Sequence, residues 1–180
     1  MTNAANRGKT AEAKVHAHLK DIAAAHATFD FQRNQDAHSA GGHMSVAQTG
    51  DFAAFGLYKG LGYLFRDLPP NPSGSPVAAM SGIIMVSRNF VIEVKEVKHA
   101  FRLPYKNFSA DKVARIKKRE LAGAEGIVLI RFMPADEWRA VPTSFFYERN
   151  LDKPSGSWDL SAEPFVDYRT AISELVGMAP

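Results

Sequence analysis

Apolar residues recur at helical spacing near both ends of the chain. Val15, Leu19 and Ile22 fall at positions i, i+4 and i+7 of a stretch that is rich in alanine. This spacing places them on one face of a helix, and alanine favours helix formation. The pattern predicts a first helix over residues 9–25. A weaker pattern predicts a closing helix over residues 167–176.

A second amphipathic segment lies in the middle of the chain. Residues 110–121 carry Val113, Ile116 and Leu121 at positions that we expect to face the interior, and Gly123 follows shortly after them. A glycine just past a periodic segment is a common helix stop. We therefore expect a helix that ends near this glycine.

Strand-like patterns separate the helices. Segments with alternating or continuous apolar residues occur at 29–31, 51–57, 83–86, 90–97 and 126–132, with a weaker strand or turn signal at 138–146. We expect the third and fourth strands to pair through a turn at Ser87–Asn89. The continuous β-branched run at 126–132 indicates a sheet that is covered on both faces. The order of elements predicts an α/β (α+β) domain with a mixed central sheet.

Length and composition indicate one globular domain. The chain has 180 residues, of which 46% are hydrophobic and 23% are charged, so it has enough apolar surface for its own core. The segment Pro69–Pro76 holds four prolines and must be a surface loop, and a second break lies at Asp152–Ser157. The longest weakly polar run, Val77–Val86, is about half the length of a membrane span. With no signal-peptide pattern at the N-terminus, we expect a cytoplasmic protein without a membrane partner.

Several kinds of chemistry are excluded by residue types. The chain has no cysteine, which excludes disulfides, thiolate zinc sites, iron–sulfur clusters and cysteine nucleophiles. The six histidines form no ligand pair at metal-binding spacing on one face, so a zinc site is not expected. No serine stands in a G-x-S-x-G pattern. Carboxylates remain as the leading metal ligands.

The strand at 90–97 carries the clearest candidate chemistry. Its period of two puts Glu93 and Lys95 side by side on one face, although a solvated, salt-bridged edge strand would show the same pattern. Upstream, Asp51 follows a glycine at the start of another strand, where it could also simply cap a turn. Asp51, Glu93 and the Val94 carbonyl would together give hard oxygen ligands suited to Mg²⁺. Lys95 would then hold the attacking water and offset charge at a phosphorus.

Positive charge is concentrated around this strand. The whole chain has a formal net charge of +3, but residues 88–119 alone contain ten basic and three acidic side chains. Lys112, Arg115 and Arg119 lie at i, i+3 and i+7 and share a helix face. Such a stripe suits phosphate contacts, and a solvated lysine-rich helix is the alternative. Its position directly after the acidic strand favours DNA as the partner.

The motifs taken together resemble the PD-(D/E)xK nuclease superfamily, and within it RecU-type Holliday junction resolvases and similar phage proteins. The resemblance spans residues 6–132 and is carried by the segments Asn6–Glu12, Arg33–Asp36, Gly50–Phe52, Ile92–Glu96, Phe101–Phe108 and Gly123–Ile130. It implies a restriction-endonuclease-like core and a Mg²⁺-dependent DNA endonuclease, with Mn²⁺ able to substitute. A branched DNA substrate would imply a homodimer with two sites.

The resemblance also assigns roles to residues. It implies that Asp51 and Glu93 bind the metal, that Lys95 is catalytic and that Glu12 is a further acid from the first helix. A first-turn glutamate that interacts favourably with the helix dipole is the alternative for Glu12. The basic side chains expected to contact DNA are Arg33, Lys98, Arg102, Lys106, Lys112, Arg115 and Arg119.

Two features depart from the family pattern. About forty residues separate Asp51 from Glu93, which implies an insertion at about 58–82 and leaves Asp67 as a second candidate for the acidic ligand. A C-terminal extension would cover about 133–180. Other functions stay open from the sequence alone: a related exonuclease or site-specific endonuclease, or a non-catalytic DNA-binding accessory protein in recombination. If the protein is phage-encoded, its compartment would be the host cytoplasm.

Overall fold

A computed structural model gives the architecture of the chain. The structure describes residues 9–34, 50–64, 80–99, 101–133, 135–147 and 155–178. The expected Pro69–Pro76 loop, the first half of the break at 152–157 and the alternative ligand Asp67 lie outside these residues, as do His38 and His43.

Three α-helices, two short 3₁₀ helices and seven strands make up the described chain. They are α1 (Lys9–Ala25), β1 (Phe29–Arg33), β2 (Phe52–Leu64), β3 (Met80–Val97), β4 (Arg102–Pro104), η3 (Tyr105–Asn107), α2 (Ala110–Leu121), β5 (Ala124–Phe132), β6 (Glu137–Pro142), η4 (Thr143–Phe146), β7 (Ser157–Asp159) and α3 (Tyr168–Val176).

The central sheet is mixed. Its five strands run in the order β1-β2-β3-β5-β6. The first three are antiparallel, β3 and β5 are parallel, and β6 is antiparallel to β5. A parallel pair needs a crossover, and α2 supplies it between β3 and β5. The α2 crossover therefore brings its own residues over the strand that carries Glu93 and Lys95.

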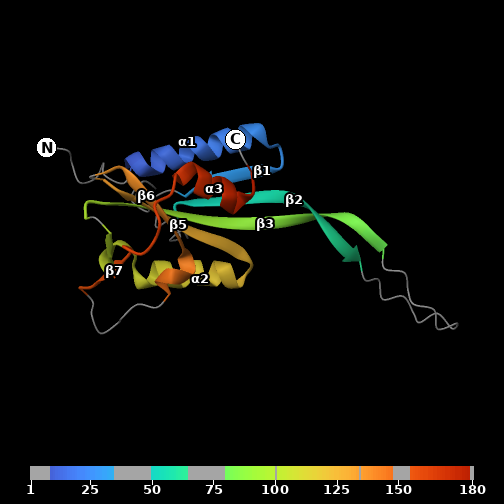
Figure 1. Cartoon of the computed structure of the whole chain (residues 1–180). Coiled ribbons are helices and arrows are strands. Elements are labelled where there is room, and N and C mark those ends of the chain that lie inside the picture. The colour runs from blue at the N-terminus through green and yellow to red at the C-terminus, as the bar shows by residue number, and fades with distance from the viewer. Residues whose placement is uncertain are drawn as a thin grey trace, which may run out of the picture.

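Helices cover both faces of the sheet, as the apolar run in β5 predicted. Figure 1 shows α1 and α3 on one face and α2 on the other, with the β2–β3 ribbon extending beyond the helices. Each face has its own apolar cluster. One contains Val15, Leu19 and Ile22 of α1, and the other contains Ile116 of α2. The α/β class with a mixed central sheet flanked by helices is confirmed.

Two details of the expected elements are wrong. Ser87–Asn89 is not a turn, because β3 runs through it and pairs it with Phe55, Gly56 and Leu57 of β2. Leu121 does not face the interior: it is 81% exposed at the last turn of α2, where the helix ends. Val113 is half-buried and Ile116 is fully buried, as expected.

A small second sheet was not predicted. Leu103 of β4 pairs with Trp158 of β7, and both side chains are buried in the cluster under α2. Phe108 and Phe146 pack against Trp158 at ring-centroid distances of 6.3 and 5.2 Å. This aromatic group joins the C-terminal segment to the same face of the sheet as α2.

Candidate active site

The structure places Asp51 at the point where β2 begins beside β3. Its backbone N–H donates to the Ile92 carbonyl at 3.0 Å, and its Oδ2 accepts from the Val94 N–H at 2.7 Å. The preceding Gly50 has φ +77°, a conformation that favours glycine. The antiparallel pairing of β2 with β3 starts at Phe52 and Ile92. Beyond that pair, the Asp51 carboxylate replaces the β2 backbone as the hydrogen-bond acceptor for the Val94 N–H of β3.

Glu93 is the most deeply buried acidic side chain of the site. It is 0% exposed and projects from β3 toward the face that α2 covers. Its Oε1 accepts from both Lys95 and Lys112, whereas its Oε2 is buried and has no hydrogen-bond partner among the described residues. Burial raises the pKa of Glu93, and the nearby charge of Asp51 adds to this while the two lysines oppose it.

Lys95 lies beside Glu93 on the same face of β3, as the period of two predicted. Its side chain is 19% exposed, and its Nζ lies 6.0 Å from the centre of the Phe108 ring. Burial alone would lower the pKa of Lys95, but the charges of Glu93 and Asp51 outweigh burial and raise it. The side chain is therefore a protonated hydrogen-bond donor in this environment.

Lys112 completes the charged group. Its Nζ lies 2.5 Å from Glu93 Oε1 and 3.6 Å from Asp51 Oδ1. It comes from the first turn of α2, whose N-cap Ser109 accepts a hydrogen bond from the Lys112 N–H. From the sequence we expected Lys112 to contact a phosphate and did not expect it to pair with Asp51 and Glu93. The feature that could have indicated this pairing is the position of Lys112 at the start of the helix that crosses back over the strand.

The oxygen donors fit a hard divalent cation. Glu93 Oε2 is a buried carboxylate oxygen that accepts no hydrogen bond from the described residues, and such burial is costly unless something else satisfies the oxygen. In a strand, the N–H and C=O of one residue point to the same neighbour, so the Val94 carbonyl faces the edge where Asp51 lies. Asp51, Glu93 and the Val94 carbonyl are thus the groups that would hold the cation.

Glu12 lies outside this group. It is in the first turn of α1, and its Oε2 pairs with Arg33 at 2.6 Å. Arg33 is paired in the sheet with Phe52, the residue after Asp51, which puts the ion pair one strand away from the site. Within the described residues, no cluster of three or more His, Asp or Glu side chains could hold a metal. The role of Glu12 as an additional acid stays a prediction.

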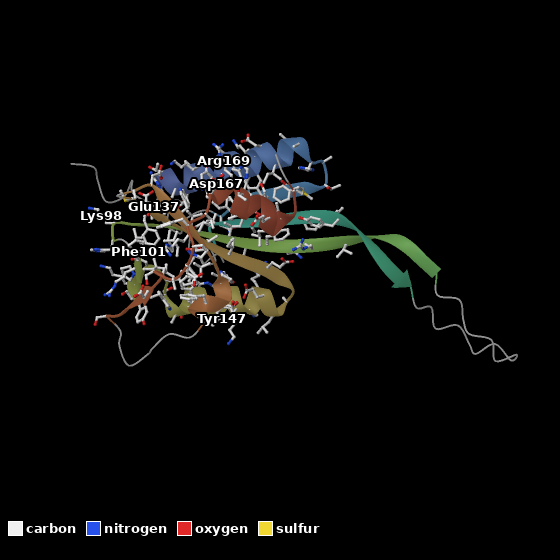
Figure 2. The ribbon with its side chains drawn as sticks, viewed as in Figure 1. Lys98, Phe101, Glu137, Tyr147, Asp167 and Arg169 are labelled. Atoms are coloured by element: carbon white, nitrogen blue, oxygen red, sulfur yellow. The ribbon has the colours of Figure 1, made fainter. Side chains whose placement is uncertain are left out.

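The predicted DNA contacts differ in exposure. Lys98, Arg102, Lys106 and Arg119 are exposed, whereas Arg115 is half-buried, and its buried Nε has no hydrogen-bond partner in the part of the chain that the structure describes. Lys98 is labelled in Figure 2 with Phe101, at the end of the molecule away from the projecting β2–β3 ribbon. The basic stripe that the sequence predicted on α2 is therefore divided: Lys112 points into the acidic site and Arg119 is open to solvent.

The described histidines on α1 have structural surroundings. His16 packs against the rings of Phe31 and Phe52, at centroid distances of 5.5 and 6.1 Å. His18 is buried and its Nε2 lies 3.1 Å from the Arg169 carbonyl oxygen. Burial lowers the pKa of both side chains. These surroundings are those of core and interhelical packing.

Comparison with known proteins gave one kind of match. No protein-family model matches the sequence, and no curated protein matches it. Among solved structures, the chain is similar to Hjc, a Holliday junction resolvase from the archaeal hyperthermophile Archaeoglobus fulgidus. The two are 20% identical with a TM-score of 0.49, and the match covers 91% of this chain and 98% of the other. A likeness of this size does not establish a shared activity. None of the helices in the described part of the chain has the length and apolar character to span a membrane.

Proposed function

We propose that the chain is a metal-dependent nuclease that hydrolyses phosphodiester bonds in DNA. The observation that carries the proposal is that Asp51, Glu93 and Lys95 lie close together in the structure. Asp51 is more than forty residues away from the other two in sequence. Asp51 lies at the start of β2 and Glu93 on the neighbouring strand β3, and both carboxylates contact the ammonium group of Lys112. Nothing in the packing of a sheet requires a fully buried glutamate with an oxygen that lacks a hydrogen bond from the described residues, so its presence supports a functional role.

The residues of the site divide the work of hydrolysis. Asp51, Glu93 and the Val94 carbonyl would hold a divalent cation, for which Mg²⁺ is our choice and Mn²⁺ a substitute. When bound, such a cation acts as a Lewis acid and stabilises the negative charge that develops at phosphorus. Lys95 donates hydrogen bonds from its ammonium to the attacking water or to a phosphate oxygen. Water forms the new bond to phosphorus as the bond to the 3′ oxygen breaks, which leaves a 5′-phosphate, and the 3′ oxygen takes a proton from solvent to become a 3′-hydroxyl.

We assign Lys95 an electrostatic role rather than that of a base. A general base must be able to lose its proton near the working pH. The carboxylates of Glu93 and Asp51 raise the pKa of Lys95, so its ammonium form is favoured in the metal-free site. It orients the nucleophile and neutralises charge while solvent accepts the proton that water releases.

The substrate we propose is branched DNA, cut by a homodimer. Four exposed basic side chains extend from the end of β3 to α2 and would contact phosphates, namely Lys98, Arg102, Lys106 and Arg119. A four-way junction has two equivalent strands to cut, which two sites related by a two-fold axis would match. The branched substrate comes from the family resemblance of the motifs, whereas the phosphodiester chemistry stands on the site itself.

The test is cleavage of labelled DNA under single-turnover conditions. A four-way junction, a linear duplex and a single strand are each incubated with Mg²⁺ or with EDTA, using wild-type protein and the variants Asp51→Asn and Lys95→Ala. We expect cutting of the junction in Mg²⁺ only, and a loss of at least about 100-fold in each variant, since each removes a group that stabilises the transition state.

Each outcome separates a different part of the proposal. Equal cutting of all three substrates would remove the branched-DNA preference and leave a nuclease. Full activity in either variant would contradict the assignment of the site. Junction binding with no cleavage under any condition would favour a non-catalytic accessory protein.

A further inference from the structure

The cation that the two carboxylates already share is the ammonium group of Lys112. Its Nζ is 2.5 Å from Glu93 Oε1 and 3.6 Å from Asp51 Oδ1, so it lies between the two side chains assigned to the metal. Its side chain is 21% exposed, compared with 15% for Asp51 and 0% for Glu93. The ammonium therefore lies in the same partly enclosed space that a divalent cation would enter.

The local charge is balanced without a metal. Two carboxylates, Asp51 and Glu93, face two ammonium groups, Lys95 and Lys112. Lys95 is on the same strand as Glu93. Among the ion pairs of the described residues, Lys95 pairs with Glu93 and not with Asp51. Lys112 instead bridges both acids from another element. It is the group that offsets their mutual repulsion when no metal is bound.

A divalent cation held by Asp51 and Glu93 would lie close to the Lys112 ammonium, which already contacts Asp51 Oδ1 and Glu93 Oε1, even when the cation takes the other Glu93 oxygen, Oε2. Both groups carry positive charge, so the repulsion between them inside this partly enclosed space is strong. A lysine side chain has a long flexible stem and can move its ammonium group to solvent. The carboxylates, by contrast, are held by the start of β2 and by β3. The lysine is therefore the part of the site that moves.

We propose that Lys112 is a built-in competitor for the metal: its ammonium holds Asp51 and Glu93 together in the metal-free protein and must be displaced for a divalent cation to bind. The inference rests on the proposed function in that it takes these carboxylates as the metal ligands. Once displaced, the Lys112 ammonium can pair with a DNA phosphate. Binding of the metal would therefore make one more positive charge available to the substrate.

The experiment measures divalent-cation affinity of the full chain without DNA, by calorimetric titration with MnCl₂ and with MgCl₂. Wild-type protein is compared with Lys112→Gln, which keeps a polar side chain and removes the charge. Lys118→Gln removes an equal charge from an exposed position in the last turn of the same helix and serves as the matched control. We expect Lys112→Gln to bind about 10-fold more tightly or better, because the competing charge is gone, and the control to change less than about 2-fold.

A second measurement addresses the metal-free state. Thermal unfolding in EDTA should occur at a lower temperature in Lys112→Gln than in the control, because the carboxylates then lose the cation between them. Addition of Mn²⁺ should raise the unfolding temperature more in Lys112→Gln than in wild-type protein. If Lys112→Gln does not fold, Lys112→Met, which keeps the aliphatic stem, is used for both measurements.

The failure of this inference differs from the failure of the proposed function. Equal or weaker cation binding in Lys112→Gln would overturn the competitor role and leave the metal site standing. The absence of any cation binding in all three proteins would contradict the metal site and the inference together. Identical unfolding temperatures in EDTA for Lys112→Gln and the control would show that Lys112 does not hold the acids.

Discussion

At the scale of single residues, charge networks beside the site fix the end of β3. Glu96 of β3 pairs with Arg131 of β5 at 3.0 Å, and Arg131 also reaches Asp136 at 2.5 Å. Lys14 of α1 contacts the same Asp136 at 2.8 Å. The chain of contacts joins the helix, the two parallel strands and the turn before β6. It holds β3 in place on the face opposite to Glu93 and Lys95.

Asp136 makes this network sensitive to acid. Hydrogen bonds from Arg131 and Lys14 lower the pKa of Asp136 to about 2, from a usual value of 3.8. A carboxylate with a lowered pKa stabilises the folded state above its unfolded-state value, and that contribution is lost as the pH falls toward the lowered value. Its side chain is 51% exposed, so solvent screening reduces the contribution to about 1 kcal/mol or less.

The prediction is that Asp136→Asn lowers the free energy of unfolding at pH 7 by up to about 1 kcal/mol, and that the difference from wild type disappears near pH 2. Asparagine is the suitable replacement because Asp136 has φ 51° and asparagine tolerates this left-handed conformation. Urea denaturation at a series of pH values measures the difference. A gap between the two proteins that persists unchanged down to pH 2 would contradict the account.

The sequence predicted three of the four charged side chains that the structure brings together, namely Asp51, Glu93 and Lys95. The period of two in a strand is fixed by backbone geometry, so Glu93 and Lys95 had to share a face. The position of Lys112 could not be predicted, since it depends on how far α2 is rotated about its axis over the sheet. Nor could the complete burial of Glu93, which depends on the packing of α2 and the aromatic residues around Phe108.

At the scale of elements, the start of β2 determines whether Asp51 reaches β3. Gly50 has φ +77°, and a Cβ built on it would lie 2.7 Å from Val91 Cγ1 and 3.2 Å from the Ile92 carbonyl oxygen. Any side chain there would push β2 away from β3 directly beside the site. Gly123 provides a comparison, because it has φ +92° but nothing within 4 Å of a built Cβ.

We predict that Gly50→Ala costs about 2–4 kcal/mol of unfolding free energy, whereas Gly123→Ala costs about 1 kcal/mol. Both changes carry the strain of a left-handed conformation, and only the first adds a clash. Gly50→Ala should also weaken Mn²⁺ binding, because it displaces Asp51. Urea denaturation and calorimetric titration measure the two effects. Equal destabilisation by the two substitutions would show that the close approach at Gly50 is not a constraint.

The elements themselves were largely predictable, and the errors have physical causes. All three helices lie where periodicity predicted them, since each buries one apolar stripe. Ser87–Asn89 looked like a turn because it is polar, but Arg88 packs its guanidinium 5.1 Å from the rings of Tyr58 and Phe90 and pairs with Glu125. Tyr58 and Glu125 lie far from Arg88 in sequence, so strand continuity there depends on tertiary contacts.

At the scale of the whole molecule, the distribution of charge matters more than its sum. The net charge of +3 conceals a segment, residues 88–119, in which basic side chains outnumber acidic ones ten to three. In the structure this segment comprises the second half of β3, β4, η3 and most of α2. Glu93, Lys95 and Lys112 of the site lie within it, so an approaching phosphate backbone meets positive potential near the proposed metal ligands.

We predict that junction DNA binding weakens steeply as salt is raised and that Lys98→Gln, Arg102→Gln and Lys106→Gln each reduce the salt dependence. Each phosphate contact removed should lower the slope of log affinity against log salt concentration by about 0.9. Lys20→Gln, an exposed change on α1 across the sheet, is the matched control and should leave the slope unchanged. Fluorescence anisotropy in EDTA, where we expect no cleavage, provides the measurement. Unchanged slopes in all three variants would place the DNA on another surface.

The central claim is that Asp51 and Glu93 bind a divalent cation beside Lys95. The most direct measurement is a crystal structure of the protein soaked in MnCl₂, with anomalous diffraction data. We predict an anomalous peak within about 2.3 Å of a carboxylate oxygen of each acid, with the Lys112 ammonium moved away from Glu93. A fully loaded crystal with no peak between Asp51 and Glu93, and with Lys112 still in contact with both acids, would contradict it.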